Sequence, residues 1–240
     1  MIRFDNVSKR FAGHTNALSD ITVEIKDGEF VFLIGPSGAG KTTFLRLLIR
    51  DILPTTGTIT VDDWKVNSLV PSQVYLLRRK VGTVFQDFKL LTDRTVYENV
   101  AVGLEILDKK TNEITPRVMD VLELVGLADK RDNFPLELSA GEMQRTGIAR
   151  AIVGGPTILL ADEPTGNLDP QTSWDILDIL CEIQKIGTTI VMATHNAGIV
   201  NHLKLRTIAL DQGRLVSDEA RGKYHLSPKP KGKKDHAGTV

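Results

Sequence analysis

One run of eight residues decides the fold of this chain: Gly35-Pro36-Ser37-Gly38-Ala39-Gly40-Lys41-Thr42, which fits the G-x-x-x-x-G-K-[ST] phosphate-binding pattern without a gap. Glycines let the backbone fold around an anion with successive N–H groups turned inward, and Lys41 adds a positive charge for the outer phosphates. Thr42 offers a hydroxyl to Mg²⁺. An apolar strand at 30–34 and a helix at 43–50 are the flanks that such a loop requires. The run therefore predicts a nucleoside triphosphate site in an α/β domain.

The size and composition of the chain bound its organisation. Its 240 residues, 41% of them hydrophobic, suffice for one compact unit of two lobes. Cys181 is the only cysteine, which excludes an intrachain disulfide and a multi-cysteine metal site, and we interpret it as part of a helix's core face. No apolar run reaches the roughly 18 residues that a membrane span needs, and the N-terminal residues lack the pattern of a signal peptide. We therefore expect a cytoplasmic protein that reaches a membrane through a partner or through its C-terminal segment.

The charge of the chain is unevenly distributed, although its formal net charge is zero. Residues 221–240 carry six lysines and arginines against one acidic residue, together with prolines and glycines, and we expect them to form a disordered tail. The remaining body is correspondingly acidic, which argues against a nucleic-acid groove as its main function. We expect no nucleic-acid partner.

The order of the predicted elements indicates an α/β core with two additions. Alternating apolar residues in 2–32 predict an antiparallel β lobe. The residues after the strand at 81–85 change to helical character, with a capping box from Thr95 to Glu98 and an apolar helical face that follows Pro116. Buried strands near 158–162 and 189–193 and a hairpin over 206–216 complete the core. We expect one domain over 1–220, with a helical lobe inserted at about 88–145.

Polar side chains stand at the ends of three of these core strands. Gln86 follows the first, Asp162 and Glu163 end the second, and His195 follows the third. Ligands of open α/β sheets bind at the carboxyl ends of the strands, so the two acids should face the phosphate-binding loop. A solvated acidic turn is the alternative, but an acidic pair at the end of an apolar strand is costly unless a cation or hydrogen bonds compensate it. His195 alone could equally be a core or capping histidine, and Gln86 alone carries no information.

These motifs, in this order and together with Leu138-Ser139-Ala140-Gly141-Glu142, resemble the nucleotide-binding domain of ATP-binding cassette (ABC) proteins over residues 1 to about 220. The resemblance implies a P-loop NTPase fold with a RecA-like core, an N-terminal antiparallel β lobe and an inserted helical lobe. It implies an ATPase that converts ATP and water to ADP and phosphate. Phe11, which could otherwise be core filler, falls where the family stacks an aromatic ring on adenine. By the same resemblance, ATP is bound by Phe11, Gly35, Ser37, Gly38, Ala39, Gly40, Lys41, Thr42, Thr43, Gln86 and Asp162, and by Ser139 and Gly141.

The resemblance also implies catalytic roles. Glu163 would polarise the attacking water, His195 would contact the γ-phosphate, and Lys41 and Gln86 would act at the reacting phosphate. Mg²⁺ would be held by Thr42, Gln86 and Asp162, the last of these through a water molecule.

Ser139 and Gly141 carry an implication about assembly. In the family, this signature reaches the γ-phosphate bound by a second domain, so a chain with one loop and one signature would act as a homodimer with the signature in trans. Ala140 departs from the usual glycine; if its position needs a positive φ, alanine costs about 1 kcal/mol. Glu142 in place of the common glutamine is a milder change.

Residues 85–100 resemble the corresponding run of the ABC ATPases of bacterial cell division. This implies an ATPase at the inner face of the plasma membrane, bound to an FtsX-like integral membrane protein that controls peptidoglycan hydrolysis at the septum. Three alternatives stay open: the ATPase of a lipoprotein or small-molecule exporter; a soluble ABC protein that acts on ribosomes or DNA through its basic tail; and a nucleotide-gated scaffold with little hydrolysis, favoured if Ala140 spoils the signature.

Overall fold

A computed structural model describes residues 1–13 and 16–224 of the chain. The first residues of the tail predicted over 221–240 are described and are tied to the body: Gly222 N donates to Leu205 O (3.1 Å) and Tyr224 N to Asn201 Oδ1 (2.8 Å). The rest of the predicted tail, from residue 225 onward, lies outside the described residues. The strands are β1 (Ile2–Arg10), β2 (Asn16–Ile25), β3 (Phe30–Ile34), β4 (Thr56–Val61), β5 (Trp64–Lys65), β6 (Val81–Val84), β7 (Ile158–Asp162), β8 (Thr189–Thr194), β9 (Arg206–Asp211) and β10 (Arg214–Glu219). The helices are α1 (Lys41–Leu48), α2 (Val74–Lys80), α3 (Val96–Glu105), α4 (Thr111–Leu124), α5 (Ala140–Ile152), α6 (Pro170–Lys185) and α7 (Ala197–Leu203), with short 3-10 turns at Val66–Ser68, Pro71–Gln73, Ala128–Lys130 and Pro135–Glu137.

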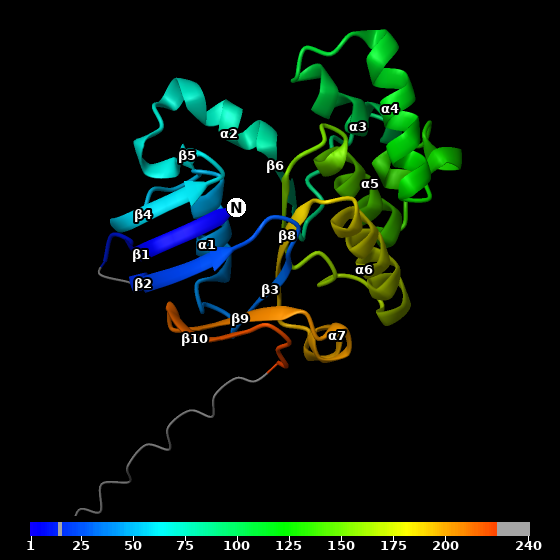
Figure 1. Cartoon of the computed structure of the whole chain (residues 1–240). Coiled ribbons are helices and arrows are strands. Elements are labelled where there is room, and N and C mark those ends of the chain that lie inside the picture. Colours follow the sequence, from blue (N-terminus) through cyan, green and yellow to red (C-terminus); the bar gives the residue numbers. More distant parts are fainter. Residues whose placement is uncertain (14–15, 225–240) are drawn as a thin grey trace, which may run out of the picture.

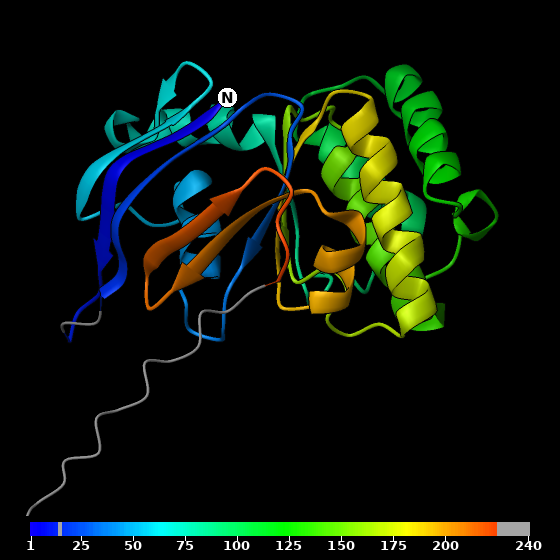
Figure 2. The same cartoon turned by 60° about the horizontal axis from the view of Figure 1, so that its bottom comes forward.

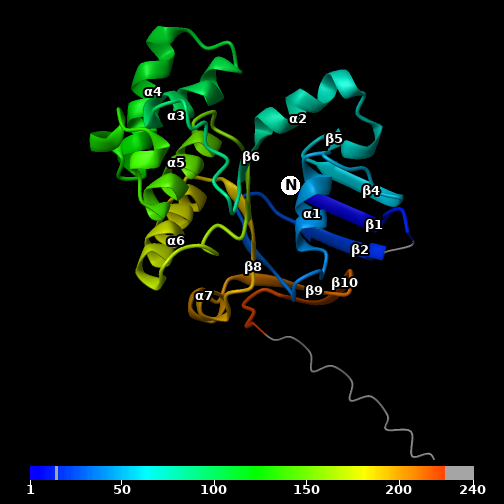
Figure 3. The ribbon, with the colours of Figure 1, turned by 180° about the vertical axis from the view of Figure 1, so that it is seen from behind.

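Two sheets organise these elements (Figure 1). The described residues form a four-stranded antiparallel sheet in the order β2-β1-β4-β5 and a six-stranded sheet in the order β10-β9-β3-β8-β7-β6. In the larger sheet, β9, β3, β8, β7 and β6 are parallel, and β10 pairs antiparallel with β9. Figure 3 shows α1 between the two sheets. The predicted combination of an α/β core with an antiparallel lobe is confirmed.

Strand β3 explains how one sheet supports two cores. Its residues are all buried, and successive side chains point to opposite faces. Phe30, Phe32 and Ile34 join the core beneath α3–α6, whereas Val31 and Leu33 join the core shared with α1 and the antiparallel sheet. Figure 2 shows the four helices along one side of the core sheet. This two-sided burial is why the loop after β3 is held firmly at the carboxyl edge of the sheet.

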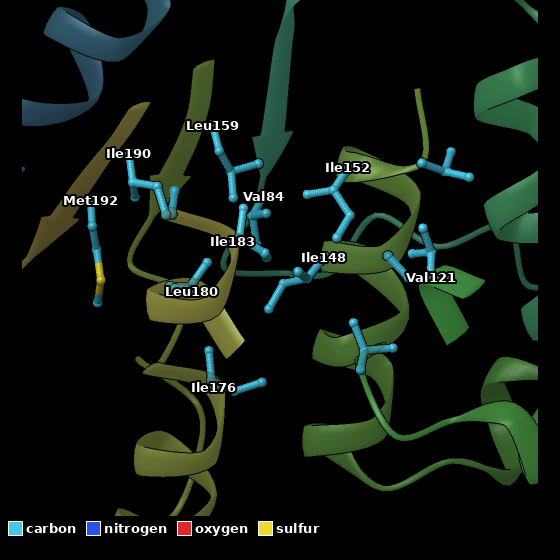
Figure 4. Packing of buried hydrophobic residues seen from close by; sticks show 14 of the residues in the cluster. Val84, Val121, Ile148, Ile152, Leu159, Ile176, Leu180, Ile183, Ile190 and Met192 are labelled. Carbon is cyan, nitrogen blue, oxygen red and sulfur yellow. The ribbon is translucent and has the colours of Figure 1, made fainter. Parts of the chain in front are cut away.

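The core beneath the helices is built from aliphatic side chains of α5 and α6 (Figure 4). Ile148 and Ile152 of α5, with Leu180 of α6, lie close to Val84 of β6 and Leu159 of β7, and all five are nearly or completely inaccessible to solvent. Burial of each such side chain stabilises the fold by about 1.5–3 kcal/mol relative to exposure. The packing connects α5, which begins at the signature, to β7, which ends at the acidic pair, and to β6, which ends shortly before Gln86.

The capping box predicted at Thr95 is confirmed: the Thr95 hydroxyl accepts from Glu98 N (3.2 Å), and Glu98 Oε2 accepts from Thr95 N (2.8 Å). The start predicted for the next helix is wrong. Helix α4 already begins at Thr111, where Glu113 caps the Lys110 backbone N–H (3.2 Å), and Pro116 therefore lies inside the helix. Proline removes only one backbone donor there. None of the described helices is long and apolar enough to cross a bilayer.

Candidate functional site

A cavity of about 700 Å³ opens at the carboxyl ends of β3, β7 and β8, a volume within the usual range of small-ligand pockets. It brings together most of the residues that the sequence placed in the nucleotide site. Its lining consists of Phe11, Asn16, Ala17, Ser37, Gly38, Ala39, Gly40, Lys41, Thr42, Thr43, Gln86, Asp162, Glu163 and His195. Gly35, Ser139 and Gly141 are not in this lining.

The phosphate-binding loop is fixed by close backbone contacts at two glycines. A Cβ at Gly35 would lie 2.3 Å from the carbonyl oxygen of Leu210 in β9, and one at Gly40 would lie 2.5 Å from that of Ala17 in β2. Gly40 also has a φ of 105° and precedes the first residue of α1. These positions therefore accept no side chain, and the loop is clamped between β9 and β2 with the N-terminus of α1 at the cavity. Gly35 lies outside the cavity lining, and its role is to permit the close backbone contact with Leu210.

The side chain of Lys41 is held against the carbonyl groups of its own loop. Its side chain is 8% exposed, and Nζ donates to the carbonyl oxygens of Gly35 (2.9 Å) and Pro36 (3.3 Å). Nζ also lies 3.8 Å from Glu163 Oε1. The ammonium group and the helix N-terminus place two sources of positive potential at one end of the cavity, which suits an anion.

Asp162, at the end of β7, lines the cavity together with Thr42. Burial raises the pKa of Asp162 above its ordinary 3.8, and Glu163 raises it further, while Thr42 and Lys41 oppose the shift. A half-buried carboxylate near a hydroxyl is a ligand set that Mg²⁺ favours, because this ion prefers oxygen donors and compensates the charge of the carboxylate. No group of three or more His, Cys, Asp or Glu side chains within the described ranges is arranged so that it could hold a metal ion by itself. The set fits a metal shared with phosphate oxygens rather than one bound by protein alone.

Glu163 has an uncommon backbone conformation, with a φ of 52°. Such a left-handed conformation costs a residue with a side chain about 1 kcal/mol or more, and it is overcome here because Glu163 N donates to Ala193 O of β8 (3.0 Å). The turn brings the carboxylate between Lys41 and the imidazole of His195, whose Nδ1 pairs with Glu163 Oε2. The Glu163 side chain is 16% exposed and that of His195 is 64% exposed. The Glu163 carboxylate thus links the loop lysine to an accessible histidine at the cavity.

Phe11 lies outside both hydrophobic cores. It is 38% exposed at the cavity, and Lys9 Nζ lies 5.0 Å from the centroid of its ring, within cation–π range. The core-filler interpretation of Phe11 is therefore wrong, and one aromatic face is available to a ligand. Asn16 and Ala17, at the start of β2, also line the cavity. Sequence reasoning missed them, because the alternating pattern that predicted β2 marks its core face and not its first residues.

The signature forms the N-terminus of α5. Ser139 caps the helix in a reciprocal capping box with Glu142: Ser139 N donates to Glu142 Oε2 (2.8 Å), and Glu142 N to Ser139 Oγ (3.3 Å). Ala140 is the first helical residue, and its φ is not positive. The expected cost of alanine there is therefore absent. Gly141 is buried beside α6. Within one chain, the signature and the cavity are separate surfaces.

Comparisons with known proteins agree with this geometry. A family model described as "ABC transporter" matches residues 18–166. The chain is 53% identical over 227 residues to the cell division ATP-binding protein FtsE of Mycobacterium tuberculosis, an alignment that covers 94% of this chain and 99% of that relative. It is 49% identical to FtsE of Bacillus subtilis, over 93% of this chain and 98% of the relative, and 46% identical to FtsE of Escherichia coli K12, over 90% and 97%.

This chain belongs to the FtsE branch of the ABC ATPases. Two solved structures are similar to this FtsE-family chain throughout. The dimeric cassette MJ0796 matches with a TM-score of 0.84 at 34% identity, and a post-hydrolysis dimer of MJ0796 bound to ADP and phosphate matches with 0.83 at 33%. Each alignment covers 93% of this chain and all of the other. The predicted ABC fold and ATPase class are confirmed.

Proposed function

We propose that this FtsE-family ATPase is the ATP-hydrolysing subunit of a bacterial cell-division complex, which dimerises on ATP and drives an FtsX-like membrane protein that regulates peptidoglycan hydrolysis at the septum. The observation that carries the hydrolytic part is the Glu163 carboxylate, held between Lys41 and His195 beside the Thr42–Asp162 pair. The cell-division part is supported by the names of the relatives that match along nearly the whole chain.

The arrangement suits in-line attack of water on a terminal phosphate. Glu163 is placed to accept a hydrogen bond from the attacking water and to orient it, and His195 holds the same carboxylate from the other side. Lys41 and the N-terminus of α1 would stabilise the charge on the phosphate oxygens. Thr42, Gln86 and Asp162 would hold Mg²⁺, which supplies further charge stabilisation when bound.

The position of the signature supports a dimer. Ser139 and Gly141 are outside the lining of the cavity in their own chain, so their contribution to ATP would come from a second copy. One similar cassette, MJ0796, is known as a dimer in two solved structures. In this arrangement each cavity is completed by the α5 N-terminus of the other subunit, whose free backbone N–H groups favour an anion.

A second cavity, also of about 700 Å³, is suited to the membrane partner. It lies between α2, β6, α3 and α5, and its lining includes the exposed apolar side chains of Tyr75, Phe85 and Ile106 and the cations Arg79 and Lys89. Phe85 lines this groove and the next residue, Gln86, lines the nucleotide cavity, so the two cavities are neighbours. We propose that it accepts a short amphipathic helix with acidic residues, supplied by the cytoplasmic side of an FtsX-like protein.

Two experiments test the proposal. Glu163→Gln should leave ATP binding intact and abolish steady-state hydrolysis, with Glu24→Gln, on the exposed face of β2, as the matched control. Wild-type-like hydrolysis by Glu163→Gln would refute the assignment of the catalytic carboxylate. The partner is tested by purifying the chain from membranes in mild detergent: recovery of an FtsX-like protein supports the cell-division role, and recovery of an export permease in its place would replace it.

A further inference from the structure

The turn that joins Glu163 to α6 is a braced element. Gly166 N donates to Glu163 O (3.0 Å) and Leu168 N to Thr165 O (3.3 Å). The turn ends at Asp169, whose side chain caps α6 by accepting from Thr172 N (3.0 Å). Hydrogen bonds therefore support residues 163–169 at both ends and in the middle, from Glu163 to the start of α6.

This turn contacts Gln86, which lies 81 residues earlier in the chain. Asn167 Nδ2 donates to the main-chain oxygen of Gln86 (3.2 Å). Gly166 lies against the side chain of the same residue, since a Cβ there would be 3.2 Å from Gln86 Nε2. The peptide and the side-chain amide of Gln86 therefore both rest on the turn that begins at Glu163.

The segment after Gln86 needs such support. Phe88 and Lys89 have positive φ values of 59° and 51°, an arrangement that residues with side chains adopt at a cost. Arg150 of α5 secures that end by donating to the carbonyl oxygens of Phe88 (2.9 Å) and Lys89 (2.7 Å). Gln86 itself is exposed, at the end of β6, so its direction toward the cavity depends on how its own peptide is held.

We propose that Asn167 is a positioning residue for hydrolysis. Its side-chain amide holds the Gln86 peptide and thereby directs the Gln86 side chain into the nucleotide cavity, which Glu163 also lines. The inference rests on the proposed role of Gln86 in hydrolysis. It assigns Asn167 no contact with ATP, because Asn167 is not part of the cavity lining.

Steady-state kinetics give the first test. Asn167→Ala should lower kcat about fivefold, the factor expected for the loss of one neutral hydrogen bond, and leave the KM for ATP within twofold because the loop and Phe11 are untouched. Asn167→Asp should lower kcat further, since a carboxylate cannot donate and would face a carbonyl oxygen. The matched control is Asn67→Ala: Asn67 likewise donates from Nδ2 to a main-chain oxygen, that of Gly57 (3.0 Å), but in the antiparallel lobe. It should leave both constants unchanged.

A double-mutant cycle separates positioning of Gln86 from a contact made by Asn167 itself. In a Gln86→Ala background, Asn167→Ala should change kcat less than twofold, because the side chain that Asn167 positions is gone. The same fivefold loss in that background would overturn the proposal, as would an unchanged kcat in the single variant.

Hydrogen–deuterium exchange provides a readout that does not depend on turnover. Without nucleotide, backbone amides of residues 85–90 should exchange faster in Asn167→Ala and Asn167→Asp than in the wild type or in Asn67→Ala. Unchanged exchange in both Asn167 variants would overturn the inference even if Glu163→Gln abolishes hydrolysis. Conversely, faster exchange together with a hydrolytically active Glu163→Gln would leave the Asn167 contact standing and overturn the proposed catalytic assignment instead.

Discussion

The methyl group of Thr172 lies directly against Gly141: a Cβ on Gly141 would come within 2.4 Å of Thr172 Cγ2. The threonine is fixed in this orientation because Asp169 accepts from both its backbone N–H and its hydroxyl. The signature glycine thus has a packing role between α5 and α6 within one chain. That role is separate from any contact its amide makes with ATP.

Gly141→Ala should destabilise the chain through this contact. The methyl group forces α5 and α6 apart or Thr172 out of its rotamer, at a cost of about 1–3 kcal/mol in the free energy of unfolding. Urea unfolding of the nucleotide-free protein measures it. Thr172→Ser is the matched change, because serine keeps the hydroxyl bound by Asp169 and removes the methyl group. The double variant should recover most of the lost stability; a double variant as unstable as Gly141→Ala would exclude Thr172 as the cause.

Phe11→Ala should weaken ATP binding with little effect on stability. Because the ring is 38% exposed and lies outside both cores, its loss leaves no internal cavity, whereas it removes an aromatic face worth about 1–3 kcal/mol per stacked base. We expect the Kd for ATP to rise about tenfold or more and the unfolding midpoint without nucleotide to stay within about 2 °C.

Phe134→Ala is the matched control for Phe11. Phe134 is 44% exposed, beside the Pro135–Glu137 turn, and does not line the nucleotide cavity. It should leave ATP affinity unchanged. Equal loss of affinity in the two variants, or a large loss of stability in Phe11→Ala, would contradict the assignment of Phe11 to the ligand.

The parts of the site that sequence could predict are those with local chemistry. The loop at 35–42 and the acidic pair at 162–163 follow apolar strands, and strand ends share one edge of a parallel sheet, so their meeting required no knowledge of distant packing. The start of α4 was misplaced because proline is a stronger sequence signal than the Glu113 cap that in fact begins the helix.

Long-range contacts could not be predicted in this way. The Gly141–Thr172 contact and the Asn167–Gln86 hydrogen bond join residues that are 31 and 81 positions apart. Nothing in the sequence around the glycine or the asparagine indicates which distant residue it contacts. Sequence analysis did not predict helix α7, because an apolar pattern over seven residues is too short to indicate a helix. The helix is nevertheless capped: Asn196 Oδ1 accepts from Ile199 N (3.3 Å). Ala140 shows the reverse: a substitution that looked costly in sequence is neutral once the residue is seen in the first turn of α5.

Glu142→Gln should make α5 less stable in a pH-dependent way. Hydrogen bonds from the Ser139 backbone and hydroxyl lower the pKa of Glu142 below its ordinary 4.5, so the folded state favours the carboxylate. This contribution is fully present above pH 4.5 and is lost as the pH falls through the lowered value in the folded state. Glutamine keeps an acceptor oxygen for Ser139 but removes the negative charge at the helix N-terminus, at a cost of about 0.5 kcal/mol near pH 7.

Denaturant unfolding at pH 7 and at pH 3 measures this difference. The gap between wild type and Glu142→Gln should shrink as the carboxyl protonates, while Glu24→Gln on β2 should show no comparable gap at neutral pH. ATP hydrolysis by Glu142→Gln should stay near the wild-type rate, because the Ser139 cap and the helical backbone of Ala140 and Gly141 are retained. A pH-independent gap would mean that the hydrogen bonds, and not the charge, hold the signature in place; a lost hydrolytic rate would mean that the glutamate does more than cap the helix.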